Sequence, residues 1–193
     1  MISREHRLFL KRWLKNPGQI GAIAPSSARL ADAMARQVPK GGSGPVIELG
    51  GGTGKITAGL LRAGIDPARL VVIERDPHLH RLLQQHYPKI HVVLGDAAEL
   101  AKAVRPLGIT QADAVVSGLP LLIFPREVQD AIGHGVFELL KPGAPFIQFT
   151  YGPYSPVSRE RLGITGRVAS WVGINLPPAS VWVYRRAPAQ MPN

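Results

Sequence analysis

The chain has 193 residues, with 23 Lys and Arg against 13 Asp and Glu, no Cys, and 45% apolar residues. This length and apolar content fit one globular domain with a sizeable core, and a second full-sized domain is not expected. The lack of Cys excludes disulfides, thiolate catalysis and Cys-ligated metal sites, and it is compatible with a reducing compartment. The formal net charge of +10 predicts a polyanionic partner, either nucleic acid or anionic lipid.

The charge excess lies at the two ends of the chain. Residues 1–40 carry a net charge of +6 and residues 150–193 carry +4, whereas residues 41–149 hold ten charged side chains of each sign. This distribution predicts a neutral ligand-binding or catalytic body with basic flanks that converge on one face. We expect residues 1–40 to form an N-terminal helical segment and residues 41–193 to form the catalytic domain.

No secretory or membrane-spanning segment is expected. The N-terminus lacks the apolar run of 7 to 15 residues that a secretory signal needs. The longest uncharged apolar stretch, residues 168–184, is interrupted by Asn175, Pro177 and Pro178, which makes it a poor membrane helix. The pattern favours a soluble or peripheral protein.

Strand and helix patterns alternate after the Gly-rich linker at residues 40–45. Short apolar runs predict strands at residues 46–49, 70–73, 90–94, 112–117 and 145–149, with helices at 55–63, 77–86 and 127–140. Such alternation predicts βαβ units and a doubly wound α/β fold with a mostly parallel sheet. Two further strands, at residues 167–173 and 179–185, have no helix between them, so they predict an antiparallel hairpin that closes the sheet edge and brings the total to seven strands.

A glycine cluster follows the first predicted strand and opens a helix. Residues 48–54 read Glu-Leu-Gly-Gly-Gly-Thr-Gly, and Gly50, Gly52 and Gly54 allow a tight turn whose backbone approaches a ligand closely. The turn is not a phosphate-binding P-loop, because Lys55 is followed by Ile56 rather than by Ser or Thr. A Gly-rich strand-to-helix turn without a ligand is the alternative.

Acidic residues also stand at the ends of the next two predicted strands. Ligands of doubly wound sheets bind at the carboxyl ends of the strands. Glu74 lies twenty residues after Gly54, where a carboxylate can accept both hydroxyl groups of a ribose. Asp96 follows the third strand and can accept the amino group of an adenine. The three strand ends together predict a nucleoside-containing ligand, which leaves a dinucleotide dehydrogenase as a competing interpretation.

With these residues, the chain resembles the class I S-adenosylmethionine-dependent methyltransferases over roughly residues 18–185. Glu48 before the glycines, Asp96 after the third strand and the terminal hairpin fit that family better than they fit a dehydrogenase. The resemblance implies S-adenosylmethionine as cofactor and S-adenosylhomocysteine as product, with no metal. It also implies that the cofactor is bound by Ile20, Ser26, Glu48, Gly50, Gly52, Glu74, Arg75, Asp96, Ala97 and Ser117.

More narrowly, the chain resembles the bacterial phospholipid N-methyltransferases, which convert phosphatidylethanolamine towards phosphatidylcholine and are relatives of the ribosomal RNA adenine dimethyltransferases. The resemblance rests on residues 9–14 (FLKRWL), 20–27 (IGAIAPSS), 48–54, 117–120 (SGLP) and 149–152 (FTYG). It implies that the enzyme methylates phosphatidylethanolamine and its mono- and dimethyl forms. It also implies that Ser117, Gly118, Leu119 and Pro120 line the methyl-transfer site, and we expect Tyr151 beside the amine.

The residue after Pro120 separates lipid from nucleic acid as substrate. Enzymes that methylate the exocyclic amine of adenine place an aromatic side chain after this Pro, so that the extruded base stacks on it. Here Leu121 follows, so a planar base loses its stacking partner. An RNA adenine-N6 methyltransferase is therefore the alternative function, and no nucleic-acid partner is expected.

The N-terminal segment predicts a basic amphipathic helix. On a helical wheel Phe9, Trp13 and their apolar neighbours share one face, while Lys11 and Lys15 lie on another with Arg12 beside it. Such a helix lies in a membrane interface, although an ordinary first helix that packs Phe9 and Trp13 on the core gives the same pattern. We expect a monomer bound peripherally to an anionic phospholipid surface, at the cytoplasmic face of the membrane, with residues 1–40 also covering the cofactor and substrate.

The attacking nitrogen needs a free lone pair, whereas a lipid ammonium is mostly protonated near neutral pH. Glu48, Glu74 and Asp96 are committed to the cofactor, so positioning and desolvation are expected to carry most of the rate. Trp13, Tyr151 and Tyr154 are aromatic candidates for holding a quaternary product. For the lipid phosphate, Arg185, Arg186 or an N-terminal cation is the expected partner.

Overall fold

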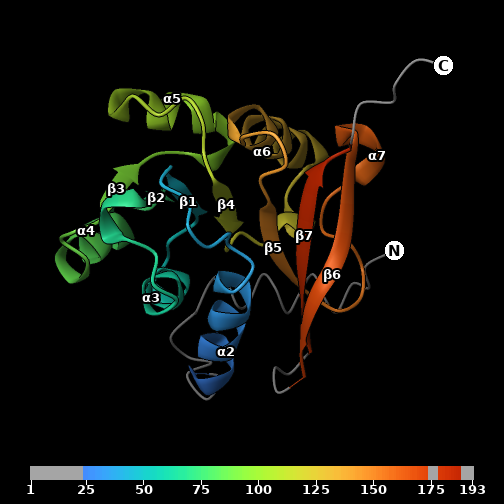
Figure 1. Ribbon diagram of the computed structural model, residues 1–193, viewed down its shortest axis with the longest axis horizontal. Helices are drawn as coiled ribbons and strands as arrows, with labels where there is room; N and C mark the ends of the chain where they lie inside the picture. Colours follow the sequence, from blue (N-terminus) through green and yellow to red (C-terminus); the bar gives the residue numbers. More distant parts are fainter. Residues whose placement is uncertain (1–23, 174–177, 188–193) are drawn as a thin grey trace.

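The computed structural model describes residues 24–173 and 178–187, which form one seven-stranded sheet between two layers of helices (Figure 1). The strand order is β3-β2-β1-β4-β5-β7-β6. Strands β1 to β5 run parallel, and β7 pairs antiparallel with both β5 and β6. The strands span β1 Val46–Leu49, β2 Leu70–Glu74, β3 His91–Leu94, β4 Ala114–Ser117, β5 Phe146–Tyr151, β6 Ile164–Val172 and β7 Ala179–Arg186.

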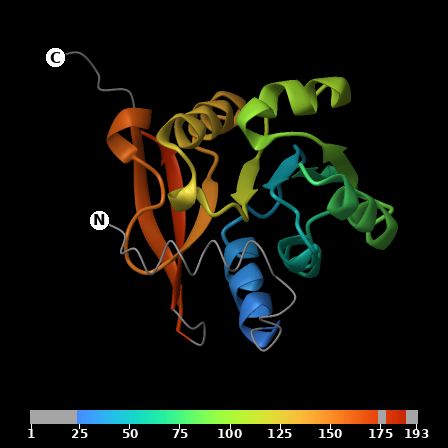
Figure 2. The ribbon, with the colours of Figure 1, turned by 180° about the vertical axis from the view of Figure 1, so that it is seen from behind.

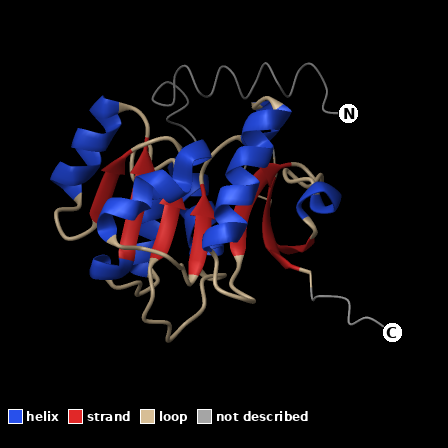
Figure 3. Cartoon of the chain, turned by 90° about the horizontal axis from the view of Figure 1, so that it is seen from above, coloured by secondary structure: helices blue, strands red, loops and turns tan. Residues whose placement is uncertain are grey.

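Helices cover both faces of the sheet (Figures 2 and 3). The helices α2, α3 and α4 bury Leu30, Met34, Leu60 and Leu83 against one face, and α5 and α6 bury Leu100, Val104, Ile132 and Val136 against the other. The helices span α2 Ala24–Ala35, α3 Lys55–Arg62, α4 Pro77–His86, α5 Leu100–Val104, α6 Arg126–Leu139 and α7 Arg159–Leu162. Short 3-10 turns lie at η2 Pro67–Arg69, η3 Ala97–Glu99, η4 Arg105–Leu107 and η5 Leu121–Ile123.

The central strands form because their apolar runs are covered on both faces. Every residue of β1, β2 and β4 is buried, which is the pattern of a parallel sheet between two helical layers. Helix α4 begins where the sequence supplies a start signal, since the Asp76 side chain accepts hydrogen bonds from the backbone N–H groups of His78 and Leu79, with Pro77 in the first turn.

The predicted doubly wound fold and the antiparallel strand pair at its edge are confirmed. Two short helices were not predicted: α5, which has five residues, and α7, which has four. Neither is long enough to show a helical period in the sequence. Helix α2 falls within the predicted N-terminal segment, and its Met34 is fully buried in the cluster shared with the sheet.

The parallel strands all end at one edge of the sheet, which we call the carboxyl edge (Figure 3). Because β6 runs antiparallel to β7, and β7 antiparallel to β5, strand β6 ends at this edge as well. The register places Tyr151, Ala179 and Val172 side by side there. The opposite edge, where β7 ends at Arg186, is called the amino edge.

Candidate functional site

The turn after β1 brings the backbone of two neighbouring strand ends into close contact. Gly50 has a φ of 75°, in the left-handed region that favours glycine. A Cβ atom at this position would lie 2.5 Å from Cδ2 of Leu119, in the loop after β4. A side chain at residue 50 would therefore have to displace Leu119, and the glycine keeps the turn and the loop in direct contact.

Glu48 lies in β1, directly before this turn, and its carboxyl group is fully buried. Its Oε2 atom accepts a hydrogen bond of 2.7 Å from Oγ1 of Thr57 in α3. Its Oε1 atom is buried without any hydrogen-bond partner. Burial raises the pKa of Glu48 to about 8, against the lowering effect of the Thr57 hydrogen bond. This site thus holds a buried acceptor that needs a donor from a ligand.

Glu74 ends β2 and joins the two neighbouring turns. Its Oε2 atom accepts the N–H of Gly52 and its Oε1 atom accepts the N–H of Asp76, each at 2.8 Å. Each carboxylate oxygen has a second lone pair, so the group can still accept hydroxyl donors from a ribose. The structure therefore places Glu74 at the glycine turn, as the spacing in the sequence predicts.

Asp96 follows β3 with a partly exposed side chain. Its Oδ1 atom accepts the N–H of Ala98 at 2.9 Å, and its Oδ2 atom lies 3.5 Å from the exposed guanidinium of Arg75. Ala97 is buried in the cluster under α5 and α6. Asp96 and Arg75 are thus brought together at the ends of neighbouring strands, as expected, while the side chain of Ala97 belongs to the core.

The loop after β4 is held in place by side chains beneath it. The buried Ser117 accepts the N–H of Leu119 on its Oγ atom at 3.2 Å. Gly118 approaches the turn after β1 so closely that a Cβ there would lie 3.0 Å from the carbonyl oxygen of Gly50. Pro120 then leads into η5, where Leu121 is only 2% exposed. Of the four predicted methyl-transfer residues, Gly118 and Leu119 therefore contact the glycine turn, and Ser117 lies buried beneath them.

Two further residues of this site were not predicted. Gln148 of β5 is fully buried beside Ser117, and its Nε2 atom donates to the carbonyl oxygens of Leu119 at 2.9 Å and Phe149 at 2.8 Å. Its Oε1 atom is buried without a partner. Tyr87 covers the turn from α4, with its hydroxyl donating to the carbonyl of Gly54 at 3.1 Å. A lone amide within the apolar run of residues 146–149 is the one sequence signal that could have identified Gln148.

Tyr151 lies at the end of β5, as expected for a residue of the carboxyl edge. Its ring packs edge-on against Phe149 at 5.6 Å, in contact with the cluster on the α2–α3 face. Burial raises the pKa of its hydroxyl above the ordinary value, so the phenol stays protonated near neutral pH. Tyr154, the other aromatic candidate in this region, is 66% exposed.

Arg185 and Arg186 do not reach this site. They lie at the amino edge, where Arg185 donates to the carbonyl of Gly143 and Arg186 donates twice to the carbonyl of Phe137. These guanidinium groups hold the end of α6 and the turn after it. The expectation that they bind a lipid phosphate beside the reacting amine is corrected by this placement, because β7 runs antiparallel and ends at the wrong edge.

The predicted membrane-binding residues Phe9, Lys11, Arg12, Trp13 and Lys15, and the predicted cofactor residue Ile20, lie outside the described residues. Ser26 lies in the first turn of α2.

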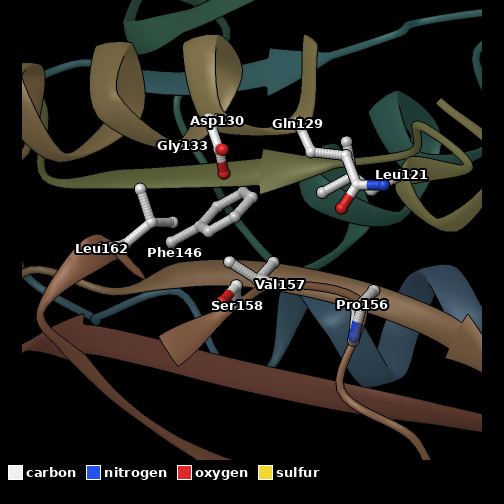
Figure 4. Close-up of a pocket in the computed structure, with 9 residues that line it drawn as sticks. All are labelled: Leu121, Gln129, Asp130, Gly133, Phe146, Pro156, Val157, Ser158 and Leu162. Carbon is white, nitrogen blue, oxygen red and sulfur yellow. The ribbon is translucent and has the colours of Figure 1, made fainter. Parts of the chain in front are cut away.

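The crevice between α6 and residues 156–158 is not a second ligand site (Figure 4). Phe146, Val157 and Leu162 converge in it and leave no space for a water molecule. Asp130 at its rim pairs with Arg161 at 3.1 Å.

The residues of the glycine turn fit S-adenosylmethionine. The buried Oε1 atom of Glu48 lacks a donor, and the cationic amino group of that cofactor is such a donor. Glu74 and Asp96 stand at the next two strand ends, where a ribose and an adenine can be bound. The glycines among residues 50–54 allow such a cofactor to approach the backbone closely.

Comparison with known proteins points to the same chemistry. The family described as "Methyltransferase domain" matches residues 46–143. The ornithine lipid N-methyltransferase of Singulisphaera acidiphila is 35% identical over 181 residues, which cover 92% of this chain and 94% of that protein. The ribosomal RNA small subunit methyltransferase A of Synechococcus sp. is 35% identical over 103 residues, but these cover 51% of this chain and only 33% of that relative.

Solved structures share the fold at low sequence identity. The N-methyltransferase NodS from Bradyrhizobium japonicum superposes with a TM-score of 0.67 at 15% identity, covering 85% of this chain and 98% of that chain. The glycopeptide N-methyltransferase MtfA superposes with a TM-score of 0.60 at 15% identity, covering 81% of this chain and 94% of that chain. MtfA was crystallised with S-adenosylmethionine, and also with S-adenosylhomocysteine and sinefungin.

Replacing Glu74 by Ala is expected to weaken S-adenosylmethionine binding by roughly 10- to 100-fold. The change removes a charged acceptor for the ribose and releases the N–H groups of Gly52 and Asp76, and hydrogen bonds to charged groups contribute about 1.5 to 3 kcal/mol. Isothermal titration calorimetry measures the dissociation constant. Glu99→Ala, which removes an exposed carboxylate paired with Lys102, is the matched control. An unchanged constant in Glu74→Ala would show that the ribose is bound elsewhere.

Replacing Glu48 by Gln is expected to stabilise the ligand-free protein at alkaline pH. The pKa of this carboxyl is about 4.5 in the unfolded chain and about 8 in the folded protein, so the folded state binds the proton more tightly. The free energy of unfolding of the wild type therefore falls as pH rises from about 4.5 to 8, and the amide escapes this loss. Thermal unfolding should give similar midpoints at pH 5 and a midpoint about 5 °C higher for the variant at pH 8.5. A constant difference across that range would contradict the assignment.

Proposed function

This chain belongs to the methyltransferase-domain family of S-adenosylmethionine-dependent enzymes, and from that premise we propose that it methylates a primary amine in the head group of a membrane lipid. The observation that carries the proposal is the loop after β4. In this loop the residue after Pro120 is a packed Leu121, whereas a nucleic-acid enzyme of this family would have an exposed aromatic side chain there.

The packing of Leu121 supports an aliphatic amine as substrate. Leu121 is 2% exposed and belongs to the cluster under α6, so the position after Pro120 turns into the core. An extruded base needs a stacking partner at this point. A lipid ammonium needs only a hydrogen-bond acceptor, and we propose the backbone carbonyl of Gly118 for this role.

The coverage of the relatives supports the same choice. The relative named as a lipid N-methyltransferase matches over almost the whole length of both proteins, whereas the relatives named as ribosomal RNA methyltransferases match over a third of their own length. The shared part with the RNA enzymes is thus limited to about half of this chain. A function common to the full length is better represented by the lipid enzyme.

Two lipid amines fit the proposal. Phosphatidylethanolamine is the acceptor that the sequence resemblance implies, and ornithine lipid is named as the substrate of the full-length relative. Both are amphiphiles with a primary amine near an anionic group. We propose that lipids of this class are the substrates and that the enzyme acts on them at an anionic bilayer surface. Within residues 24–173 and 178–187, no helix is long and apolar enough to cross a bilayer.

The geometry of the site suggests how the amine is presented. When bound, S-adenosylmethionine supplies an electrophilic methyl group. Glu48, Gly52 and Glu74 hold the cofactor at the turn after β1, and Gly118 and Leu119 place the substrate nitrogen beside it. Ser117 fixes the N–H of Leu119 and Gln148 fixes its carbonyl oxygen. The loop is thus ordered before substrate arrives, which reduces the entropy lost in reaching the reactive geometry.

Loss of a proton must precede attack by the nitrogen. Glu74 accepts two backbone N–H groups, Asp96 contacts Ala98 and Arg75, and we assign the buried Glu48 to the amino group of the cofactor. Tyr151 stays protonated near neutral pH because burial raises its pKa. We propose that desolvation beside the loop after β4 favours the neutral amine, which releases its proton to water.

Methyl incorporation tests the substrate class directly. The protein is incubated with radiolabelled S-adenosylmethionine and, in parallel, with vesicles of phosphatidylethanolamine, micelles of ornithine lipid, or 16S ribosomal RNA. We expect label in one or both lipids and none in RNA. Label in RNA alone would overturn the proposal. Glu74→Ala serves as the control for contaminating activity, because its incorporation should fall by about tenfold or more at limiting cofactor.

A further inference from the structure

A cationic groove lies at the carboxyl edge, between α2 and the end of β6, apart from the glycine turn. Its free volume is about 250 Å³, and it is lined by Arg29, Asp32, Ala33, Arg36 and residues 170–173. The helix packs directly against β6 (Figure 1), so the groove has one wall from each element. We call it the α2–β6 groove.

The cations of this groove have no carboxylate partners in the described part of the chain. Arg29 lies in α2 and Arg36 in the turn directly after it, and both are exposed. Asp32 lies between them, but its Oδ1 atom accepts a hydrogen bond of 2.6 Å from Arg62 of α3. Together these three arginines and one aspartate carry a net charge of +2, so the groove attracts an anion.

An exposed tryptophan lies on strand β6, with its side chain on the face opposite to that of Val172. Trp171 is 55% exposed, although its neighbour Val172 is buried. An indole ring combines a large apolar body with one N–H group, and it is therefore common at the boundary between water and lipid. Since β6 is the last strand of the sheet, this ring lies on the outside of the molecule.

The position of the groove relates it to the methyl-transfer loop. Val172 pairs with Ala179, and Ala179 pairs with Tyr151 at the end of β5. Strand β5 in turn pairs with β4, which ends at Ser117. The end of β6 that lines the groove and the loop at residues 117–120 therefore lie at the same edge of the sheet.

We propose that the α2–β6 groove binds the anionic head groups of a lipid bilayer and so orients the carboxyl edge towards the membrane. Arg29 and Arg36 bind phosphate groups, and Trp171 lies at the level of the head groups. This inference rests on the proposed function, because a lipid-methylating enzyme must present its loop to the bilayer. The groove contributes a membrane contact that is independent of the cofactor site.

Charge reversal with a matched control tests the groove. Arg29→Glu/Arg36→Glu is compared with Lys89→Glu/Arg105→Glu, which makes the same change in net charge at exposed positions that precede β3 and β4, at the amino edge. Binding is measured by sedimentation with phosphatidylglycerol vesicles. We expect the groove variant to bind at least about tenfold more weakly than wild type, and the control variant to stay within about twofold.

Three results would overturn the proposal: wild type that does not bind these vesicles, equal losses in the two double variants, or a groove variant that loses affinity for RNA but not for vesicles. Calorimetry with S-adenosylmethionine verifies that the variants are folded. Methylation of lipid in detergent micelles tests the enzyme activity separately, so that a failure of vesicle binding is distinguishable from a failure of the proposed function.

Discussion

The site depends on the contact between the turn after β1 and the loop after β4. Parallel pairing sets Leu49 beside Ser117, and the N–H of Gly118 donates to the carbonyl of Leu49 at 2.9 Å. Beyond that bond, the side chain of Leu119 fills the space beside Gly50, and the carbonyl of Gly50 and the side chain of Ile56 fill the space beside Gly118. The cofactor turn and the substrate loop are therefore one structural unit, and a shift in either changes the distance between the two reactants.

Two buried polar groups lie at the same edge as this contact. Glu48 and Gln148 each retain a buried oxygen without a partner, and an unsatisfied buried acceptor costs about 1 to 3 kcal/mol. The core on both faces is otherwise apolar, so the cost is concentrated where the ligands bind. Glu48 can recover it from a cationic donor on the cofactor. Gln148 spends its two N–H groups on the carbonyls of Leu119 and Phe149, so its amide orders the substrate loop from below.

The architecture could be predicted from the sequence because its signals are local. The apolar runs at β1, β2 and β4 are bounded by Gly, Asp and Pro, and α4 begins at an Asp-Pro pair. The positions of Glu48, Glu74 and Asp96 at neighbouring strand ends could be predicted for the same reason, since Glu48 lies within such a run, Glu74 ends one and Asp96 follows one. Gln148 and Tyr87 could not, because their roles come from packing between segments 29 and 33 residues apart. Arg185 and Arg186 were misplaced because a charge count ignores the direction of the strand that carries it.

The roles of the charged side chains also could not be predicted from the sequence. Among the described residues, several cations at the amino edge are paired within the protein. At the amino edge Asp113 binds Lys141 and Arg69, and Arg185 and Arg186 bind backbone carbonyls of α6 and the turn after it, so these cations are used within the protein. At the carboxyl edge Arg29 and Arg36 have no such partners in the described chain. Arg29 and Arg36 are therefore available to an external anion.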